Sequence, residues 1–79
     1  MNYTDFLELH KTCVAAMRTY FFEAETTTKL LAKCTAEPLS LGERSGLRSQ
    51  EIVENDAHVV YLDAKRLLHR AALGYGSPN

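Results

Sequence analysis

Glu54 and His58 are the residues of this chain whose types and spacing come closest to a metal site. They lie four residues apart, with Asp56 between them, and an i, i+4 pair on a helix can share a metal ion. A di-metal helical bundle, however, uses Glu-x-x-His motifs together with inward glutamates from other helices, and the sequence has no Glu-x-x-His. We therefore predict that Glu54 and His58 form a structural surface pair, and we assign no metal ligand and no cofactor.

The histidines also raise the question of catalysis. His10 falls on the apolar stripe described below, where a polar residue can fix the register of a helical bundle. It could act as a general base, but no partner nucleophile is apparent, so we predict a core histidine. His58 could serve as a phosphorelay histidine, an idea that rests on analogy with other helical bundles alone. We assign no catalytic residue and favour a role without enzymatic activity.

The two cysteines, Cys13 and Cys34, lie 21 residues apart and lack the spacing of a metal site. On one straight helix they are separated by about 31 Å, whereas a disulfide needs Cα atoms within about 7 Å. We predict free thiols in a reducing cytosol, acting as small buried apolar side chains. If two copies of the first helix pack antiparallel, Cys13 of one copy would face Cys34 of the other.

The charge balance argues against a nucleic-acid or membrane protein. Nine Lys and Arg stand against ten Asp and Glu, and phosphate binding needs clustered positive charge. The densest basic group, Lys65, Arg66 and Arg70, lies near a predicted helix C-terminus, where cations favour the helix dipole. No glycine-rich phosphate loop, secretory signal or 18-residue apolar run is present. We therefore expect a cytoplasmic protein that binds neither membranes nor nucleic acid.

Apolar residues recur with helical spacing from Tyr3 to about Cys34. They form a heptad stripe whose steps alternate between four and three residues: Phe6, His10, Cys13, Met17, Tyr20, Ala24, Thr27, Leu31 and Cys34. Leu7, Val14, Phe21 and Thr28 follow at intervals of seven and widen it. We predict a helix over about 3–35, capped by Asn2 or Thr4, that continues through the segment ETTTK although β-branched residues weaken helices.

A second stripe has the same spacing in the second half of the chain: Val53, Ala57, Val60, Ala64, Leu67 and Ala71. Pro38 must lie outside the helices, which places a turn at about 36–40. Ser40 and Glu43 fit a capping box, whereas Ser49 is an alternative start ten residues later. Gly74 is a suitable stop. We predict a second helix over about 41–73 and an irregular tail over 74–79.

A chain of 79 residues allows one domain, 1–79, and the short turn makes the two helices antiparallel neighbours whose positions match end to end. Each apolar stripe is wider than one partner helix can cover. Because no staple is visible and small domains need one, we predict an all-α helical hairpin that dimerises into an antiparallel four-helix bundle. The alternative is a different protein with a matching helical face.

These features predict a non-catalytic, dimeric protein–protein interaction or adaptor module. The alternative function is a small metal- or ligand-binding bundle, possibly enzymatic, that uses Glu54, His58 or His10. The sequence leaves open which helices meet at the dimer axis and what the partner is.

Overall fold

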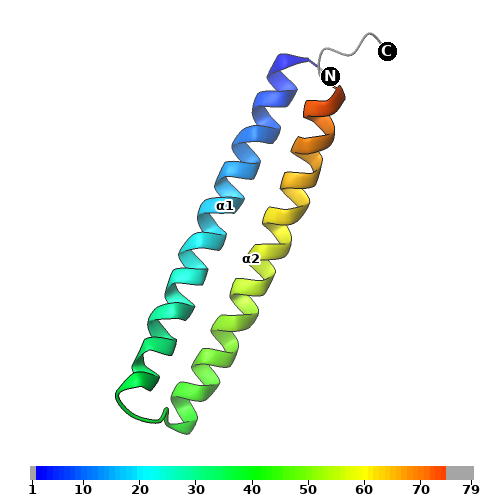
Figure 1. The fold of residues 1–79 in the computed structure, drawn as a ribbon. Helices are drawn as coiled ribbons and strands as arrows, with labels where there is room; N and C mark the ends of the chain where they lie inside the picture. The colour runs from blue at the N-terminus through cyan, green and yellow to red at the C-terminus, as the bar shows by residue number, and fades with distance from the viewer. Residues whose placement is uncertain (1, 75–79) are drawn as a thin grey trace.

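The computed structural model describes residues 2–74, which form two long antiparallel helices lying side by side (Figure 1). Helix α1 spans Tyr3–Ala32, a single 3₁₀ turn η1 spans Lys33–Thr35, and helix α2 spans Leu41–Gly74. The molecule measures 60 × 15 × 15 Å. The predicted all-α hairpin is confirmed. The predicted tail beyond Gly74 lies outside the described residues.

The helix boundaries follow from caps that the sequence contains. Asn2 caps α1, since its side-chain oxygen accepts a hydrogen bond of 2.8 Å from the Asp5 N–H. At the start of α2, the Glu43 N–H donates to the Ser40 hydroxyl at 3.2 Å, and the Ser40 N–H donates to the Glu43 carboxylate at 3.1 Å. This reciprocal pair is a capping box. The start near Ser40 is therefore confirmed, and the alternative at Ser49 is wrong.

The capping box also sets the charge state of Glu43. The hydrogen bond from the Ser40 backbone, followed by the bond with its side chain, lowers the pKa of the Glu43 carboxyl from its ordinary value of 4.5. Both bonds favour the ionised form, which also suits the positive end of the α2 dipole. The start of α2 is thus held by an ionised side chain even though Gly42 and Gly46 weaken its first two turns.

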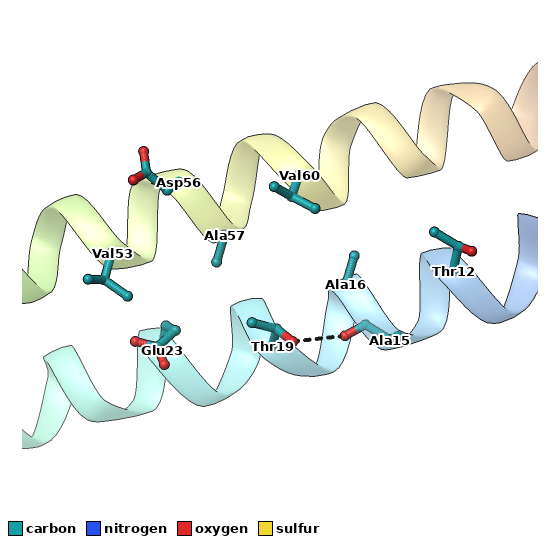
Figure 2. Close-up of a pocket in the computed structure, with 9 residues that line it drawn as sticks. All are labelled: Thr12, Ala15, Ala16, Thr19, Glu23, Val53, Asp56, Ala57 and Val60. Atoms are coloured by element: carbon teal, nitrogen blue, oxygen red, sulfur yellow. Dashed lines mark hydrogen bonds between the residues drawn. The ribbon is translucent and has the colours of Figure 1, made fainter.

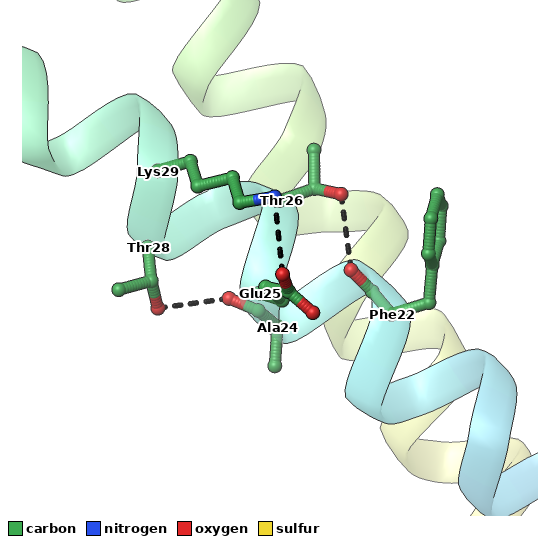
Figure 3. A network of polar contacts seen from close by, with 6 residues as sticks. All are labelled: Phe22, Ala24, Glu25, Thr26, Thr28 and Lys29. Atoms are coloured by element: carbon green, nitrogen blue, oxygen red, sulfur yellow. Dashed lines mark hydrogen bonds and ion pairs between the residues drawn. The ribbon is translucent and has the colours of Figure 1, made fainter.

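Helix α1 continues through its threonine-rich segment, as predicted. Each threonine hydroxyl donates to the carbonyl oxygen four residues earlier, as Figure 3 shows for Thr26 with Phe22 and Thr28 with Ala24, at 3.0 and 2.9 Å. In the same view Lys29 pairs with Glu25 at 3.0 Å. These bonds satisfy the hydroxyl groups locally, so three consecutive β-branched residues do not interrupt the helix.

The two helices meet along a seam that differs from the predicted stripes at every second position. On α1, residues Phe6, Cys13, Tyr20 and Thr27 turn inward as predicted, but Leu9, Ala16, Glu23 and Leu30 alternate with them. On α2, Ala57, Ala64 and Ala71 are inward as predicted, but Glu54, Tyr61 and Leu68 alternate with them. His10 and Leu67 are exposed in the hairpin, so neither lies in the seam between α1 and α2 where the stripes placed it.

The physical reason for this difference is the width of the apolar stripes. Each helix carries apolar residues on both sides of the predicted stripe, so the helix can rotate without losing an apolar contact face. The observed rotation brings Tyr61 and Leu68 against the cluster of Cys13, Ala16 and Ala64, in place of Val60 and Leu67. A tyrosine ring buries more area than a valine, which favours this choice.

The most deeply buried positions of the seam hold small side chains. Its buried residues are Cys13, Ala16, Thr27, Ala64 and Ala71, and among residues 2–74 no large side chain is fully buried. Larger side chains such as Tyr61 and Leu68 are only half-buried in it. Many other large apolar side chains lie outside the seam and are exposed: Tyr3, Leu7, Phe21, Phe22, Leu31, Leu41, Ile52, Val53, Val59, Val60, Leu67 and Leu73. Two helices alone therefore leave most of the apolar surface uncovered.

Candidate interaction surfaces

An apolar groove runs along one side of the seam. It encloses about 470 Å³ and is lined by Thr12, Ala15, Ala16, Thr19, Glu23, Val53, Asp56, Ala57 and Val60. Figure 2 shows the α2 valines above the small residues of α1, with Glu23 and Asp56 near the same end. We call this surface the valine groove. The small residues of α1 form its floor, since Ala15, Thr12 and Thr19 fill little space.

The opposite side of the seam carries bulkier residues from α1. Thr28 and Leu31 line a shallow groove there with Glu51, Glu54 and Asn55 of α2. Leu7, Val14 and Phe21 precede Thr28 at intervals of seven, which places them on the same side of α1. We call Leu7, Val14, Met17, Phe21 and Leu31 the α1 outer stripe. Phe21 and Leu31 are 56% and 46% exposed.

His58 belongs to an aromatic stack and does not form the predicted pair with Glu54. Its ring stacks on Tyr20 with centroids 4.6 Å apart, and Tyr20 stacks on Tyr61 at 6.1 Å. The Lys65 ammonium lies 5.8 Å from the centre of the Tyr61 ring. Within residues 2–74 no hydrogen bond or ion pair joins Glu54 to His58. The prediction of a Glu54–His58 surface pair is therefore wrong.

The residues named as candidates for chemistry do not come together. His10 lies exposed on α1, whereas His58 is half-buried between the helices. Across the part of the chain that the structure describes, no three His, Cys, Asp or Glu side chains gather closely enough to hold a metal ion.

The two thiols have different surroundings. Cys13 is 7% exposed and packs with Ala16 and Ala64, so α2 already covers it. Cys34 lies in the 3₁₀ turn and is exposed, which contradicts the prediction that both cysteines are buried. The reason is that α1 ends at Ala32, so Cys34 lies beyond the straight helix on which the stripe was drawn.

A polar contact in the half of the seam nearer the turn was missed by the sequence reasoning. The Gln50 amide donates both to the Glu23 backbone carbonyl at 3.2 Å and to the Glu23 carboxylate at 2.8 Å. Close by, the buried Thr27 hydroxyl donates to the same Glu23 carbonyl at 3.0 Å. The end-to-end matching of the helices did carry a signal for this contact, since it places residues 23 and 50 near each other.

The comparisons with other proteins return no relatives. Neither family models, nor curated proteins, nor solved structures match this chain. Neither of the two described helices has a stretch long and apolar enough to cross a membrane.

Proposed function

We propose that this chain is a non-catalytic interaction module that works as a homodimer, in which the α1 outer stripes of two copies pack antiparallel within a four-helix bundle. The observation that carries the proposal is the apolar surface along the outside of α1. Its residues are bulky and recur at helical spacing; Leu7, Phe21 and Leu31 are exposed, and Val14 and Met17 are half-buried. A strip of this kind on a small protein is an association surface.

The total surface area supports the same proposal. The chain exposes 6103 Å². A compact monomer of 8.9 kDa exposes about 4,800 Å² by the usual scaling with mass. Standard interfaces bury about 800 Å² from each partner. Burial of a standard interface against a second copy would therefore bring the exposed area of each chain closer to the value for a compact protein of the same mass.

The positions of the stripe residues fit a twofold axis. The midpoint of α1 falls between Met17 and Arg18. When two copies of α1 pack antiparallel about that point, Phe21 lies opposite Val14 of the second copy, and Leu7 lies opposite its Thr28. In both pairs a large side chain meets a smaller one, as close packing requires. The interface is self-complementary, which twofold symmetry demands.

The charges beside the stripe fit the same arrangement. In this register Lys11 lies opposite Ala24 of the second copy, one residue before Glu25, so the long Lys11 side chain lies beside that carboxylate at two symmetric places. In the hairpin these residues pair along their own helix, Lys11 with Glu8 and Glu25 with Lys29, and all four side chains are largely exposed. They are therefore free to exchange partners across the interface.

This arrangement changes the expectation for the thiols. Cys13 stays between α1 and α2 of its own chain, so it does not approach Cys34 of the second copy. We expect no Cys13–Cys34 cross-link between copies. Two free thiols suit a reducing compartment, and a cytoplasmic location is part of the proposal.

The two neighbouring phenylalanines test the proposal. Phe21 and Phe22 are 56% and 66% exposed, but only Phe21 belongs to the α1 outer stripe. We expect Phe21→Asp to weaken the dimer by about thirtyfold or more, as at a central interface residue, and Phe22→Asp to leave it unchanged. Sedimentation equilibrium gives both dissociation constants. A stable wild-type monomer at micromolar concentration, or equal effects of the two variants, would refute the proposal.

Charge exchange tests the antiparallel register. Lys11→Glu and Glu25→Lys should each weaken the dimer by about tenfold, because each puts like charges beside each other across the interface at two symmetric places. The double variant Lys11→Glu/Glu25→Lys restores opposite charges and should recover the wild-type constant. Two additive losses in the double variant would show that these residues do not face each other.

A further inference from the structure

The geometry points to a second association surface: we infer that the valine groove binds an amphipathic helix of another protein, with lysine or arginine at one end of that helix's apolar face. This inference rests on the proposed function, because the α1 outer stripe must be occupied by the second copy for the valine groove to be the free surface. It adds the chemistry of the partner, which the dimer proposal leaves open.

The shape of the groove suits a helix. It is straight, since both walls are single helices, and its lining is overwhelmingly apolar. Val53 and Val60 lie two turns apart on α2, while Ala15 and Ala16 leave room on α1 for a side chain to enter between the helices. A helix laid into such a groove inserts apolar side chains at intervals of three and four residues.

The charge of the groove indicates that the partner helix carries a cation. Its only charged lining residues are Glu23 on α1 and Asp56 on α2, both acidic. Figure 2 shows both residues near the end of the groove where Val53 lies, with the Asp56 carboxylate directed away from α1. The ion pairs found within residues 2–74 join Lys11 to Glu8, Lys29 to Glu25 and Arg66 to Asp63, so no cation neutralises either carboxylate. A partner helix with a cation at that end would complement both charges.

The valine groove and the α1 outer stripe lie on opposite sides of the seam, so the groove is distinct from the proposed dimer surface. On α2 the exposed apolar residues Val53, Val60 and Leu67 lie on the groove side, whereas the α1 outer stripe lies on the other side of the seam. Two hairpins that meet through α1 therefore leave the two valine grooves facing outward. A dimer of this kind presents two equivalent docking sites, which suits an adaptor.

A helix library displayed on phage tests the inference with the full-length dimer as bait. Each peptide has about 18 residues, or five turns, with leucine or alanine on one face and every other position drawn from lysine, glutamate, glutamine and serine. We expect the selected peptides to carry lysine at one end of the apolar face. Binding of a selected peptide should weaken by about threefold to fivefold in Asp56→Asn, the range for one exposed ion pair.

A blocked groove provides the control. Ala15→Phe places a large side chain at an exposed position of the groove floor, so it should abolish peptide binding while leaving helicity and dimer mass unchanged. The inference is overturned if no peptide is selected, if the selected peptides carry glutamate or no charge preference, or if they still bind the Ala15→Phe variant.

If Ala15→Phe instead splits the dimer, the second copy occupies the groove, and the inference fails together with the choice of dimer face. If Phe21→Asp yields folded monomers that still bind the peptides, the dimer proposal stands and the groove is independent of it.

Discussion

The seam between the helices and the outer faces of the same helices are built from opposite kinds of residue. The seam buries alanines, a cysteine and a threonine, and in its half nearer the turn it holds a polar contact between Glu23 and Gln50. The outer faces carry phenylalanine, leucine, isoleucine and valine, much of it exposed. Most globular domains show the reverse, with large apolar residues inside.

This difference indicates that the seam and the outer faces have different roles. Small residues in the seam let the two helices approach closely, but they bury little apolar area, so the seam by itself contributes limited stability. The outer faces hold the area that remains to be buried. A hairpin of this composition therefore has the properties of one subunit of a larger assembly. Adjacent residues on one helix can have quite different roles in it.

Leu68 and Leu67 provide the largest contrast between seam and outer face. Leu68 packs against Cys13, Ala16 and Ala64, whereas Leu67 is 54% exposed. We expect Leu68→Asp to unfold the protein, because an unpaired carboxylate in the seam costs several kcal/mol against a total stability of about 5–15 kcal/mol. Leu67→Asp should change the free energy of unfolding by about 0.5 kcal/mol or less. Circular dichroism during urea denaturation measures both.

The pair of leucine variants also reports on the dimer face. Leu67 lies on the groove side of α2, away from the α1 outer stripe, so Leu67→Asp should leave the mass of the dimer unchanged. Loss of the dimer in Leu67→Asp would show that the two copies meet through the groove side. Equal thermal stability of Leu67→Asp and Leu68→Asp would contradict the observed seam.

The polar half of the seam is expected to contribute less than the apolar half. Gln50→Ala removes both hydrogen bonds to Glu23 and should lower the free energy of unfolding by about 1–2 kcal/mol. Its neighbour Ser49 is exposed, so Ser49→Ala serves as the matched control and should have almost no effect. If the two variants denature at the same urea concentration, the Glu23–Gln50 contact does not hold the helices together.

The smallest expected effect lies at the start of α2, on the outside of the molecule. The folded-state pKa of Glu43 is lowered, so its contribution to stability is present above the ordinary value of 4.5 and is lost as the pH falls through the lower folded-state value. Ser40→Ala removes the side-chain part of the capping box, so the pKa of Glu43 should rise towards 4.5. Carboxyl NMR titration of wild type and variant measures this shift, and Glu43→Gln should remove the corresponding pH dependence. An unchanged Glu43 pKa in Ser40→Ala would mean that the Ser40 backbone N–H alone lowers it.

Local signals in the sequence were enough to predict the elements and their ends. Asn2, Pro38, Ser40 and Glu43 act on their own turns of the chain, so their effect does not depend on the rest of the fold. The hairpin follows from the short turn between two long helices. The candidate surfaces were predicted only in outline: the width of the stripes indicated uncovered apolar area, but not the groove or its acidic end.

The sequence by itself determined that two amphipathic helices form, where each begins and ends, and that their apolar faces are too wide for one seam. These properties depend on hydrogen bonds and side-chain spacing within single helices. Only the tertiary structure decided which residues enter the seam. His10 and Leu67 turn outward while Leu9 and Leu68 turn inward, because a wide stripe permits several rotations of each helix and the packing of Tyr61 and Leu68 on Cys13, Ala16 and Ala64 selects one. That rotation places the α1 outer stripe on one side of the seam and Val53 and Val60 of α2 on the other.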